Sequence, residues 1–195
     1  MYKKILKRVF DLFVAVIVFP FIILLILFFG IVIKITDKGP IIYKSKRLGK
    51  NNKVFNMYKL RTMKVNAPLI LNKDGSTYNS KNDERVTKIG KFLRETSIDE
   101  VPQFINVLVG DMSLIGPRAS LKEALGTFED DEKNKSKVKP GITGYTQAYY
   151  RNSIDNREKR LKDAWYADNV SFALDLKIFF KTIGTVFKRK NIYKK

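Results

Sequence analysis

The longest apolar stretch of the chain covers residues 12–33, which contain no charged residue. About 20 consecutive apolar residues are enough for a helix to cross the hydrocarbon core of a bilayer. The stretch is too long for the apolar region of a signal peptide, and no cleavage site of small residues follows it. The pattern therefore predicts a membrane-inserted helix near the N-terminus.

Two features indicate how this helix enters the membrane. Basic residues flank both of its ends, and the positive-inside rule places basic flanks in the cytoplasm. Pro20 lies inside the stretch, where a proline removes one helical hydrogen bond and bends the helix. We therefore predict a re-entrant helix over residues 1–36, kinked at Pro20, with both ends on the cytoplasmic face of the membrane. The alternative is a kinked helix that spans the bilayer.

A second apolar pattern, at near-helical spacing, occupies the C-terminal residues 170–195, with lysine and arginine between the apolar positions and no acid after Asp175. This composition is typical of an amphipathic helix that lies on an anionic leaflet. An ordinary domain helix with a solvated basic face is the alternative. The apolar positions are Phe172, Leu176, Phe179, Phe180, Ile183 and Phe187.

The remaining pattern predicts one cytoplasmic domain over residues 37–195 that is mostly α-helical with a little β structure. Segments 41–47 and 53–63 flank a Leu-Gly-Lys-Asn-Asn turn and predict a β-hairpin. Helices are predicted over residues 87–95, 100–109, 120–136 and 155–170. Loops are predicted over residues 67–86, 111–120 and 139–145. The fold class is therefore α+β, in a monotopic membrane protein.

Composition restricts the chemistry. The chain of 195 residues has neither cysteine nor histidine, so thiolate and imidazole catalysis are excluded and a zinc site is disfavoured. Lysine and arginine number 38 against 19 aspartates and glutamates, giving a net charge of +19. Such an excess predicts an anionic partner, such as nucleic acid, an acidic membrane or a phosphorylated substrate. Carboxylates would then prefer a hard cation such as Mg²⁺.

An acidic pair, Asp99 and Glu100, stands out in this basic chain. The sequence Ser97-Ile98-Asp99-Glu100 fits a helix capping box, and acids in a first helical turn also favour the helix dipole. The other interpretation is a reactive centre. Basic residues without a nearby acid recur in separate segments that could converge on the pair, namely Lys59, Arg61, Arg118 and Arg151. Converging guanidinium and carboxylate groups would predict phosphoryl transfer.

Several ordered motifs carry a resemblance to a known family. The segments KLRTM, TSIDEVPQFINVLVGDMSLIGPR and KPGITGYTQAYYRN, with DLKI near the end, resemble the bacterial sugar transferases. These are monotopic polyprenol-phosphate phosphoglycosyl transferases, and the chain looks like their small, single-domain subclass. The resemblance covers nearly the whole chain.

The resemblance implies a helix kinked at Pro20 and a transfer of sugar phosphate from a UDP-sugar to undecaprenyl phosphate. It implies that Asp99 is the nucleophile, that Glu100 helps to bind Mg²⁺, and that Arg118 contacts phosphate. No basic residue is assigned to neutralise Glu100, which also favours a cation there. Further substrate-binding positions are Lys59, Arg94 and Arg151, together with Asp163 and, from the basic pattern, Arg61.

The implied partners are the UDP-sugar, undecaprenyl phosphate, membrane lipids and downstream glycosyltransferases, with no nucleic acid. Three positions depart from the family pattern: Phe19 before the proline, Ala119 after Arg118, and Thr146 after the Gly-Tyr pair. Charge and aromatic content alone leave two other interpretations open. One is a membrane-tethered module that binds nucleic acid or anionic lipid, and the other is a structural membrane anchor.

Overall fold

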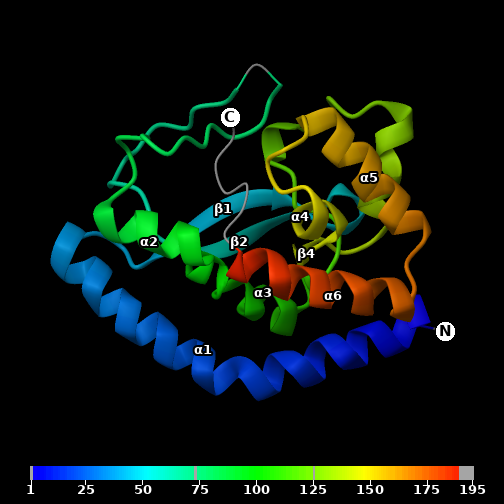
Figure 1. Ribbon diagram of the computed structural model, residues 1–195, viewed down its shortest axis with the longest axis horizontal. Coiled ribbons are helices and arrows are strands. Elements are labelled where there is room, and N and C mark those ends of the chain that lie inside the picture. Colours follow the sequence, from blue (N-terminus) through cyan, green and yellow to red (C-terminus); the bar gives the residue numbers. More distant parts are fainter. Residues whose placement is uncertain (1, 73, 125, 189–195) are drawn as a thin grey trace.

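A computed structural model describes residues 2–72, 74–124 and 126–188 (Figure 1). Six α-helices and two small sheets occupy these ranges, which confirms the prediction of a mostly helical α+β fold. The side chains of Lys4 and Phe187, and the basic residues that follow residue 188, lie outside the described part of the chain.

The helices are α1 (Lys7–Asp37), α2 (Lys88–Thr96), α3 (Gln103–Val109), α4 (Tyr145–Tyr149), α5 (Asn156–Asp168) and α6 (Phe172–Phe187). The strands are β1 (Ile42–Leu48), β2 (Val54–Leu60), β3 (Ser113–Ile115) and β4 (Gly141–Thr143). A short π-helix, η1 (Tyr2–Leu6), precedes α1. The short 3₁₀ turns are η2 (Lys50–Asn52), η3 (Ile98–Glu100), η4 (Lys122–Ala124) and η5 (Asp130–Lys137).

Helix α1 is one helix with Pro20 inside it, and it is long and apolar enough to cross a membrane. Figure 1 shows α1 bent near its middle, with both ends turned toward the rest of the protein. Only 22% of its most apolar window is buried, so α1 is not the core helix of a soluble domain. These features suggest membrane association, and the re-entrant course through the bilayer remains a prediction.

Polar contacts fix the N-terminal half of α1 to the domain. Lys7 Nζ forms an ion pair with Asp175 Oδ2 of α6 at 2.5 Å. Arg8 Nη1 donates a hydrogen bond to the Val107 carbonyl of α3 at 2.6 Å. The buried Asp11 carboxylate accepts a hydrogen bond from the backbone amide of Leu114 in β3. Helix α1 is therefore docked on three separate elements.

The predicted hairpin is confirmed. Strands β1 and β2 pair antiparallel, with Ile42 opposite Leu60 and Leu48 opposite Val54. The turn needs left-handed backbone at two asparagines of η2, a conformation that asparagine tolerates better than most residues. The inner face of β2 packs against α1 and α3 in one core cluster, formed by Ala15, Phe55, Met57, Val107, Met112 and Ala119. The hairpin thus provides the surface against which α3 packs.

Two predicted loops contain strands that the sequence pattern does not reveal. Residues 111–120 contain β3 and residues 139–145 contain β4, and the two strands pair in parallel. A Cβ added at Gly141 would lie 2.1 Å from the backbone nitrogen of Gly116, so only glycines allow this close approach. Strands of three residues are too short for a period-2 pattern, which explains why the sequence did not predict these two strands.

The predicted helix over residues 120–136 is also wrong. The structure has two separate 3₁₀ turns, η4 and η5, and Gly126 between them has a φ of 92°. Glu132 and Lys135 of η5 are buried rather than part of a solvated charged face. Glu132 is paired with Arg157 and Arg160 of α5, so the charged run of η5 holds a domain helix in place.

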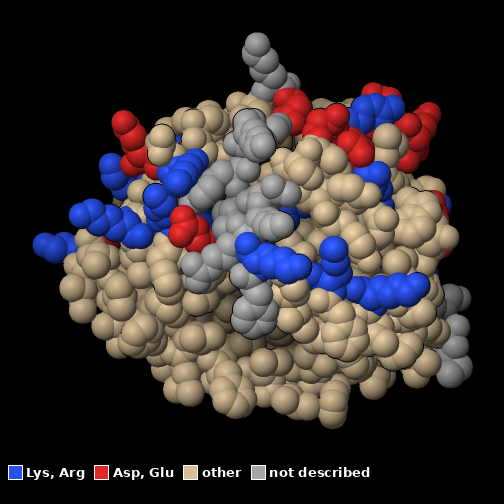
Figure 2. Space-filling view, in the orientation of Figure 1, with Lys and Arg blue, Asp and Glu red and all other residues tan. Residues whose placement is uncertain are grey.

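The two C-terminal helices are confirmed as α5 and α6. Helix α6 packs through Ile178 and Asp175, and its exposed apolar residues are Phe172, Leu176, Phe179, Phe180 and Ile183. Figure 2 shows charged side chains over the upper part of the view and a row of basic side chains across its middle, where Figure 1 places α6, while the lower part, where Figure 1 places α1, is bare of them. This polarity suits a protein that rests on a bilayer, although the interfacial position of α6 stays a prediction.

We expect both flanks of α1 to lie in the cytoplasm. Single cysteines introduced as Lys4→Cys and Lys50→Cys have a low background, because the chain has no native cysteine. Neither should react with an impermeant thiol reagent in intact cells, and both should react after permeabilisation. A spanning helix predicts external labelling at position 4, which would reject the re-entrant course. Replacing Pro20 should shift the labelling toward that spanning pattern.

Candidate active site

The acidic pair lies in the turn η3 between α2 and α3. Ser97 closes α2 with a left-handed backbone, at a φ of 61°. Its side chain makes no capping hydrogen bond, and α3 begins only at Gln103, after Pro102. The capping-box interpretation of Ser97-Ile98-Asp99-Glu100 is therefore wrong, and the helix predicted over residues 100–109 starts three residues later. The pair therefore lies in a tight turn and does not cap a helix.

Strand β2 brings Lys59 to the acidic pair. Lys59 Nζ lies 2.5 Å from Glu100 Oε1 and 4.0 Å from Asp99 Oδ2. The shorter contact is a charge-assisted hydrogen bond, and the longer one is an ion pair without direct contact. The expectation that no basic residue neutralises Glu100 is wrong, because Lys59 does so.

A buried asparagine fixes the position of α3 against β2. Asn106 is fully buried, and its Oδ1 accepts from the Tyr58 amide at 3.0 Å. Its Nδ2 donates to the Asn56 carbonyl at 2.8 Å. Replacing a buried side chain that satisfies two backbone groups is costly, because the loss of either hydrogen bond leaves a buried backbone group unpaired. Asn106 thus keeps η3, at the start of α3, in register with the strand that carries Lys59.

The two carboxyls of the acidic pair differ in their electrostatics. Burial raises the pKa of Asp99 to about 6, above its usual range, against the opposing charge of Lys59. Burial also penalises ionised Glu100, but Lys59 and Arg118 outweigh it and lower the pKa of Glu100 to about 2. Two adjacent carboxyls whose environments push their pKa values apart are typical of catalytic sites, where the two groups have different chemical roles.

Three arginines reach this region from different elements. Arg94 of α2 donates from Nε to Thr62 Oγ1 at 2.9 Å. Arg151 follows α4 with a φ of 50°, and its Nη2 lies 3.4 Å from Ser97 Oγ. Arg118 follows β3, and its side chain is exposed. The strained backbone at position 151 aims that side chain at the turn that carries the acidic pair.

The charges of these arginines converge on the acidic pair. Arg94 and Arg118 both stabilise ionised Asp99 and oppose the effect of burial on its pKa. Arg118 and Arg151 do the same for Glu100. With the lysine of β2, the structure brings together four basic residues that the sequence singled out. Such an arrangement can bind the oxygens of a phosphorylated ligand next to the two carboxylates.

Arg61 lies elsewhere, although the sequence placed it with the substrate-binding residues. Its side chain is buried, and Nη1 forms an ion pair with Asp37 Oδ2 at the end of α1, at 3.0 Å. A Cβ added at Gly39 would lie 2.0 Å from the same nitrogen, so the guanidinium is packed against the chain after α1. Arg61 therefore pins the end of α1 to the hairpin and is not placed to contact a substrate.

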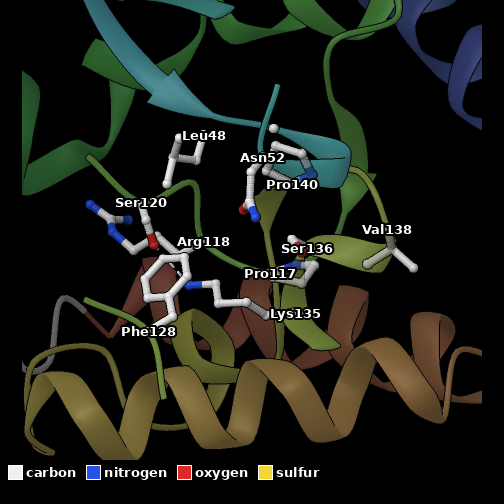
Figure 3. A pocket seen from close by; sticks show the side chains of 11 residues that line it. Leu48, Asn52, Pro117, Arg118, Ser120, Phe128, Lys135, Ser136, Val138 and Pro140 are labelled. Carbon is white, nitrogen blue, oxygen red and sulfur yellow. Dashed lines mark hydrogen bonds between the residues drawn. The ribbon is translucent and has the colours of Figure 1, made fainter. Parts of the chain in front are cut away.

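Asp163 is a positioning residue. It is 1% exposed, and its Oδ2 accepts a hydrogen bond from the Arg118 amide at 3.1 Å. Its Oδ1 accepts from Thr146 Oγ1 at 2.8 Å. Lys135 Nζ lies 3.7 Å from Oδ2 and donates to Ser120 Oγ at 3.0 Å. In Figure 3 Lys135 reaches toward Ser120, while the Arg118 guanidinium points away from it. These contacts occupy the buried carboxylate, so Asp163 holds the Arg118 loop, and the substrate contact stays a prediction.

We expect Asp163→Ala to lower the free energy of unfolding by about 3 kcal/mol, because it leaves Lys135 buried without its partner carboxylate. The matched control is Asp168→Ala on the same helix, where an exposed carboxylate pairs with Lys137 at 3.8 Å. The control should cost less than about 1 kcal/mol. Urea unfolding in detergent measures both values, and equal losses would contradict the positioning role.

The acidic pair fits Mg²⁺ in one way. Within residues 2–72, 74–124 and 126–188, no cluster of three His, Cys, Asp or Glu side chains can hold a metal. Mg²⁺ commonly binds through one or two carboxylates and completes its shell with substrate phosphates and water. Asp99 and Glu100 supply hard oxygen donors of this kind. The residues therefore fit Mg²⁺ in company with a phosphorylated ligand, not as an all-protein cage.

Sequence reasoning missed three residues that shape this region: Arg47, Asn106 and Lys135. Asn106 lies in a predicted helix and carries no local signal of its two contacts with β2. Lys135 sits in a run of charged residues, which usually forms a solvated face. Of the three, only Arg47 has a feature in the sequence that could have singled it out, because it stands at the end of an alternating strand pattern, where the strand meets a turn.

A carboxylate pair ringed by basic side chains, beside an apolar helix of membrane length, points to the class of membrane-associated proteins that handle phosphorylated substrates. The chain belongs to the bacterial sugar transferase family, whose sequence profile matches residues 2–189. The expected family is therefore confirmed.

Three curated relatives illustrate the family. An uncharacterized sugar transferase, EpsL of Bacillus subtilis, is 41% identical over 189 residues, covering 96% of this chain and 90% of EpsL. The undecaprenyl-phosphate galactose phosphotransferase of Salmonella typhimurium is 37% identical and covers 98% of this chain. The UDP-glucose:undecaprenyl-phosphate glucose-1-phosphate transferase of Klebsiella pneumoniae is 40% identical, with the same coverage. This chain spans 42% of the length of each of the last two.

Proposed function

We propose that this protein is a phosphoglycosyl transferase that moves a sugar 1-phosphate from a UDP-sugar to undecaprenyl phosphate at the cytoplasmic face of the bacterial inner membrane. This would be the first membrane-committed step of glycan assembly, with downstream glycosyltransferases as later partners. The observation that carries the proposal is the buried Asp99, whose pKa is raised by burial, next to a Glu100 neutralised by Lys59. The relatives' printed names, which include UDP-glucose and undecaprenyl phosphate, support the substrate classes.

The charge balance of the site supports a diphosphate substrate. Lys59, Arg94, Arg118 and Arg151 bring four positive charges to two carboxylates, which leaves an excess of +2 when both are ionised. The diphosphate of a nucleotide sugar carries about two negative charges and would neutralise that excess. Arginines are suited to this role because the guanidinium presents paired N–H donors to phosphate oxygens.

The proposed reaction has two steps. A carboxylate oxygen of Asp99 attacks the phosphorus that carries the sugar, and the bond from that phosphorus to the oxygen of UMP breaks. UMP leaves with the bonding electrons, and an aspartyl phosphosugar remains. A phosphate oxygen of undecaprenyl phosphate then attacks the same phosphorus and releases Asp99 as a carboxylate. Splitting the transfer lets the nucleotide leave before the lipid arrives.

The chain's own residues contribute in distinct ways. Lys59 keeps Glu100 ionised, and Arg118 stabilises the charge that develops on the transferring phosphate. Mg²⁺, when bound by Glu100 and phosphate oxygens, would supply further charge stabilisation at the leaving nucleotide. Asp163 and Lys135 hold the backbone of the loop that presents Arg118. Because Lys59 and the backbone of the Arg118 loop are held by these contacts before substrate binds, they require little reorganisation during the reaction.

One assay tests this proposal against its alternatives. Detergent-solubilised protein is incubated with a panel of UDP-sugars, Mg²⁺ and undecaprenyl phosphate, and the release of UMP is measured. Turnover with at least one sugar supports the transferase. Salt-sensitive binding of nucleic acid without turnover would instead support a basic membrane-tethered module, and the absence of both would leave a structural anchor.

A further inference from the structure

Arg47 lies near the end of β1, next to the loop that carries Arg118. A backbone bridge pairs Arg47 with Leu121, and the Leu48 amide donates to the Ser120 carbonyl at 2.9 Å. These contacts attach the end of the hairpin to the residues that follow Arg118. The side chain of Arg47 is consequently fixed beside this loop rather than free to move along the surface.

The Arg47 guanidinium has N–H donors beyond those used in its contacts within the protein. Its Nε donates to Ser45 Oγ at 3.0 Å, and its Nη1 lies 3.4 Å from the Ala119 carbonyl oxygen. A guanidinium has five N–H donors in a planar fork, so these two contacts leave most of them for another acceptor. Both protein contacts orient the fork next to the residue after Arg118.

Two guanidiniums therefore share one region without a carboxylate between them. Among the residues that the structure describes, neither Arg47 nor Arg118 forms an ion pair with an acid. Burial, followed by the charge of Arg118, lowers the pKa of Arg47 to about 10. Like charges held close together are unfavourable unless an anion binds them. The pair is thus arranged for an anionic ligand.

The position of Arg47 relative to the acidic pair decides which anion it meets. Arg47 lies opposite Phe55, four positions along the hairpin from the pairing of Tyr43 with Lys59, the lysine that contacts Glu100. Its contact with the Ala119 carbonyl places it beside the loop of Arg118, whose charge acts on both carboxyls of the acidic pair. A phosphate placed over Asp99 meets Arg118 first, and a second phosphate joined to it extends toward Arg47.

We propose that Arg47 binds the phosphate on the nucleotide side of the diphosphate, while Arg118 binds the sugar-side phosphate that Asp99 attacks. This inference rests on the proposed function and adds a residue to it. Arg47 then holds the leaving nucleotide in line with the attacking carboxylate, and it would also bind the free product UMP, which keeps that phosphate.

The test measures UMP binding to the full chain in detergent by calorimetry, together with the KM for the UDP-sugar that supports turnover. Arg47→Met should weaken UMP binding and raise KM by at least tenfold. The matched control is Lys46→Met, because Lys46 is exposed on the neighbouring position of the same strand. The control should stay within twofold of wild type.

Two outcomes would overturn the inference. One is UMP binding by Arg47→Met equal to that of Lys46→Met. The other is a fall in kcat with unchanged UMP affinity, which would mean that Arg47 only supports the Ala119 carbonyl. If thermal melting shows that Arg47→Met is unfolded, Arg47→Lys decides, because it keeps the charge but loses the fork. A folded Lys variant should bind UMP at least threefold more weakly, and unchanged binding rejects the proposal.

The same measurements separate this inference from the proposed function. Wild-type protein that binds UMP through Arg47 but releases no UMP from any UDP-sugar would reject the reaction and keep the phosphate contact. Turnover combined with UMP binding that does not depend on Arg47 would keep the reaction and reject the contact.

Discussion

Asp99→Asn should abolish transfer, by about 10⁴-fold or more, while the protein stays folded. Asparagine has nearly the shape of aspartate but cannot form the acyl phosphate through which we propose that the reaction passes. Asp99 is buried in a tight turn and makes no helix cap, so the substitution removes a charge without removing a structural contact of that kind. Release of UMP, in the presence and absence of lipid acceptor, measures the loss.

The proposed covalent step has its own readout. Wild-type protein should exchange labelled UMP into UDP-sugar without any polyprenol phosphate, because the first step is reversible and needs no acceptor. Asp99→Asn should lose this exchange. Asp111→Asn, beyond the other end of α3, is the matched control and should keep both activities. Absence of exchange in wild type, and of a phosphosugar mass on the peptide with Asp99, would favour direct transfer between the two bound substrates.

Removing divalent cations should reduce turnover by about 100-fold or more, and adding Mg²⁺ should restore it. The physical reason is that the site has few groups to neutralise the charge of the leaving nucleotide. Two carboxylates and four basic residues can hold the diphosphate, but the leaving nucleotide gains additional negative charge as its bond breaks. Chelator titration of the UMP-release assay measures the dependence.

Glu100→Gln separates metal use from folding. Glutamine can still receive a hydrogen bond from Lys59, but it carries no charge for a cation, so the variant should need much more Mg²⁺. Glu158→Gln on the surface of α5, where the carboxylate pairs with Lys162, should leave the Mg²⁺ requirement unchanged. Full activity of wild type in excess chelator would show that the four basic residues suffice and that the Mg²⁺ prediction is wrong.

The sequence predicted those parts of the fold whose signals are local and long. Seven-residue strands with an alternating pattern and a turn of glycine and asparagine gave the β1–β2 hairpin. The spacing of apolar residues gave α5 and α6. The acidic pair was recognisable because adjacent acids are unusual in a chain with this basic excess, and because its flanking motifs resemble those of a known family.

The missed parts depend on contacts between distant segments. Arg61 resembles its neighbour Lys59 in sequence, but it meets Asp37, which lies 24 positions earlier, and is thereby taken out of the site. Asp163 looks like an exposed acid of a polar helix until Arg118 and Thr146 fold onto it. The parallel pair β3–β4 joins residues that are 28 positions apart. No local pattern contains such pairings.

The attachment of α1 to the domain has a mechanical consequence. Lys7, Arg8 and Asp11 tie the first turns of the helix to α6, α3 and β3, and Arg61 ties its far end to the hairpin. A rod clamped at both ends cannot tilt on its own. If α1 lies in the bilayer as proposed, the depth at which it floats sets the height of Asp99 above the lipid headgroups. Bilayer thickness would then affect whether the phosphate of a long-chain lipid can reach Asp99, the proposed nucleophile.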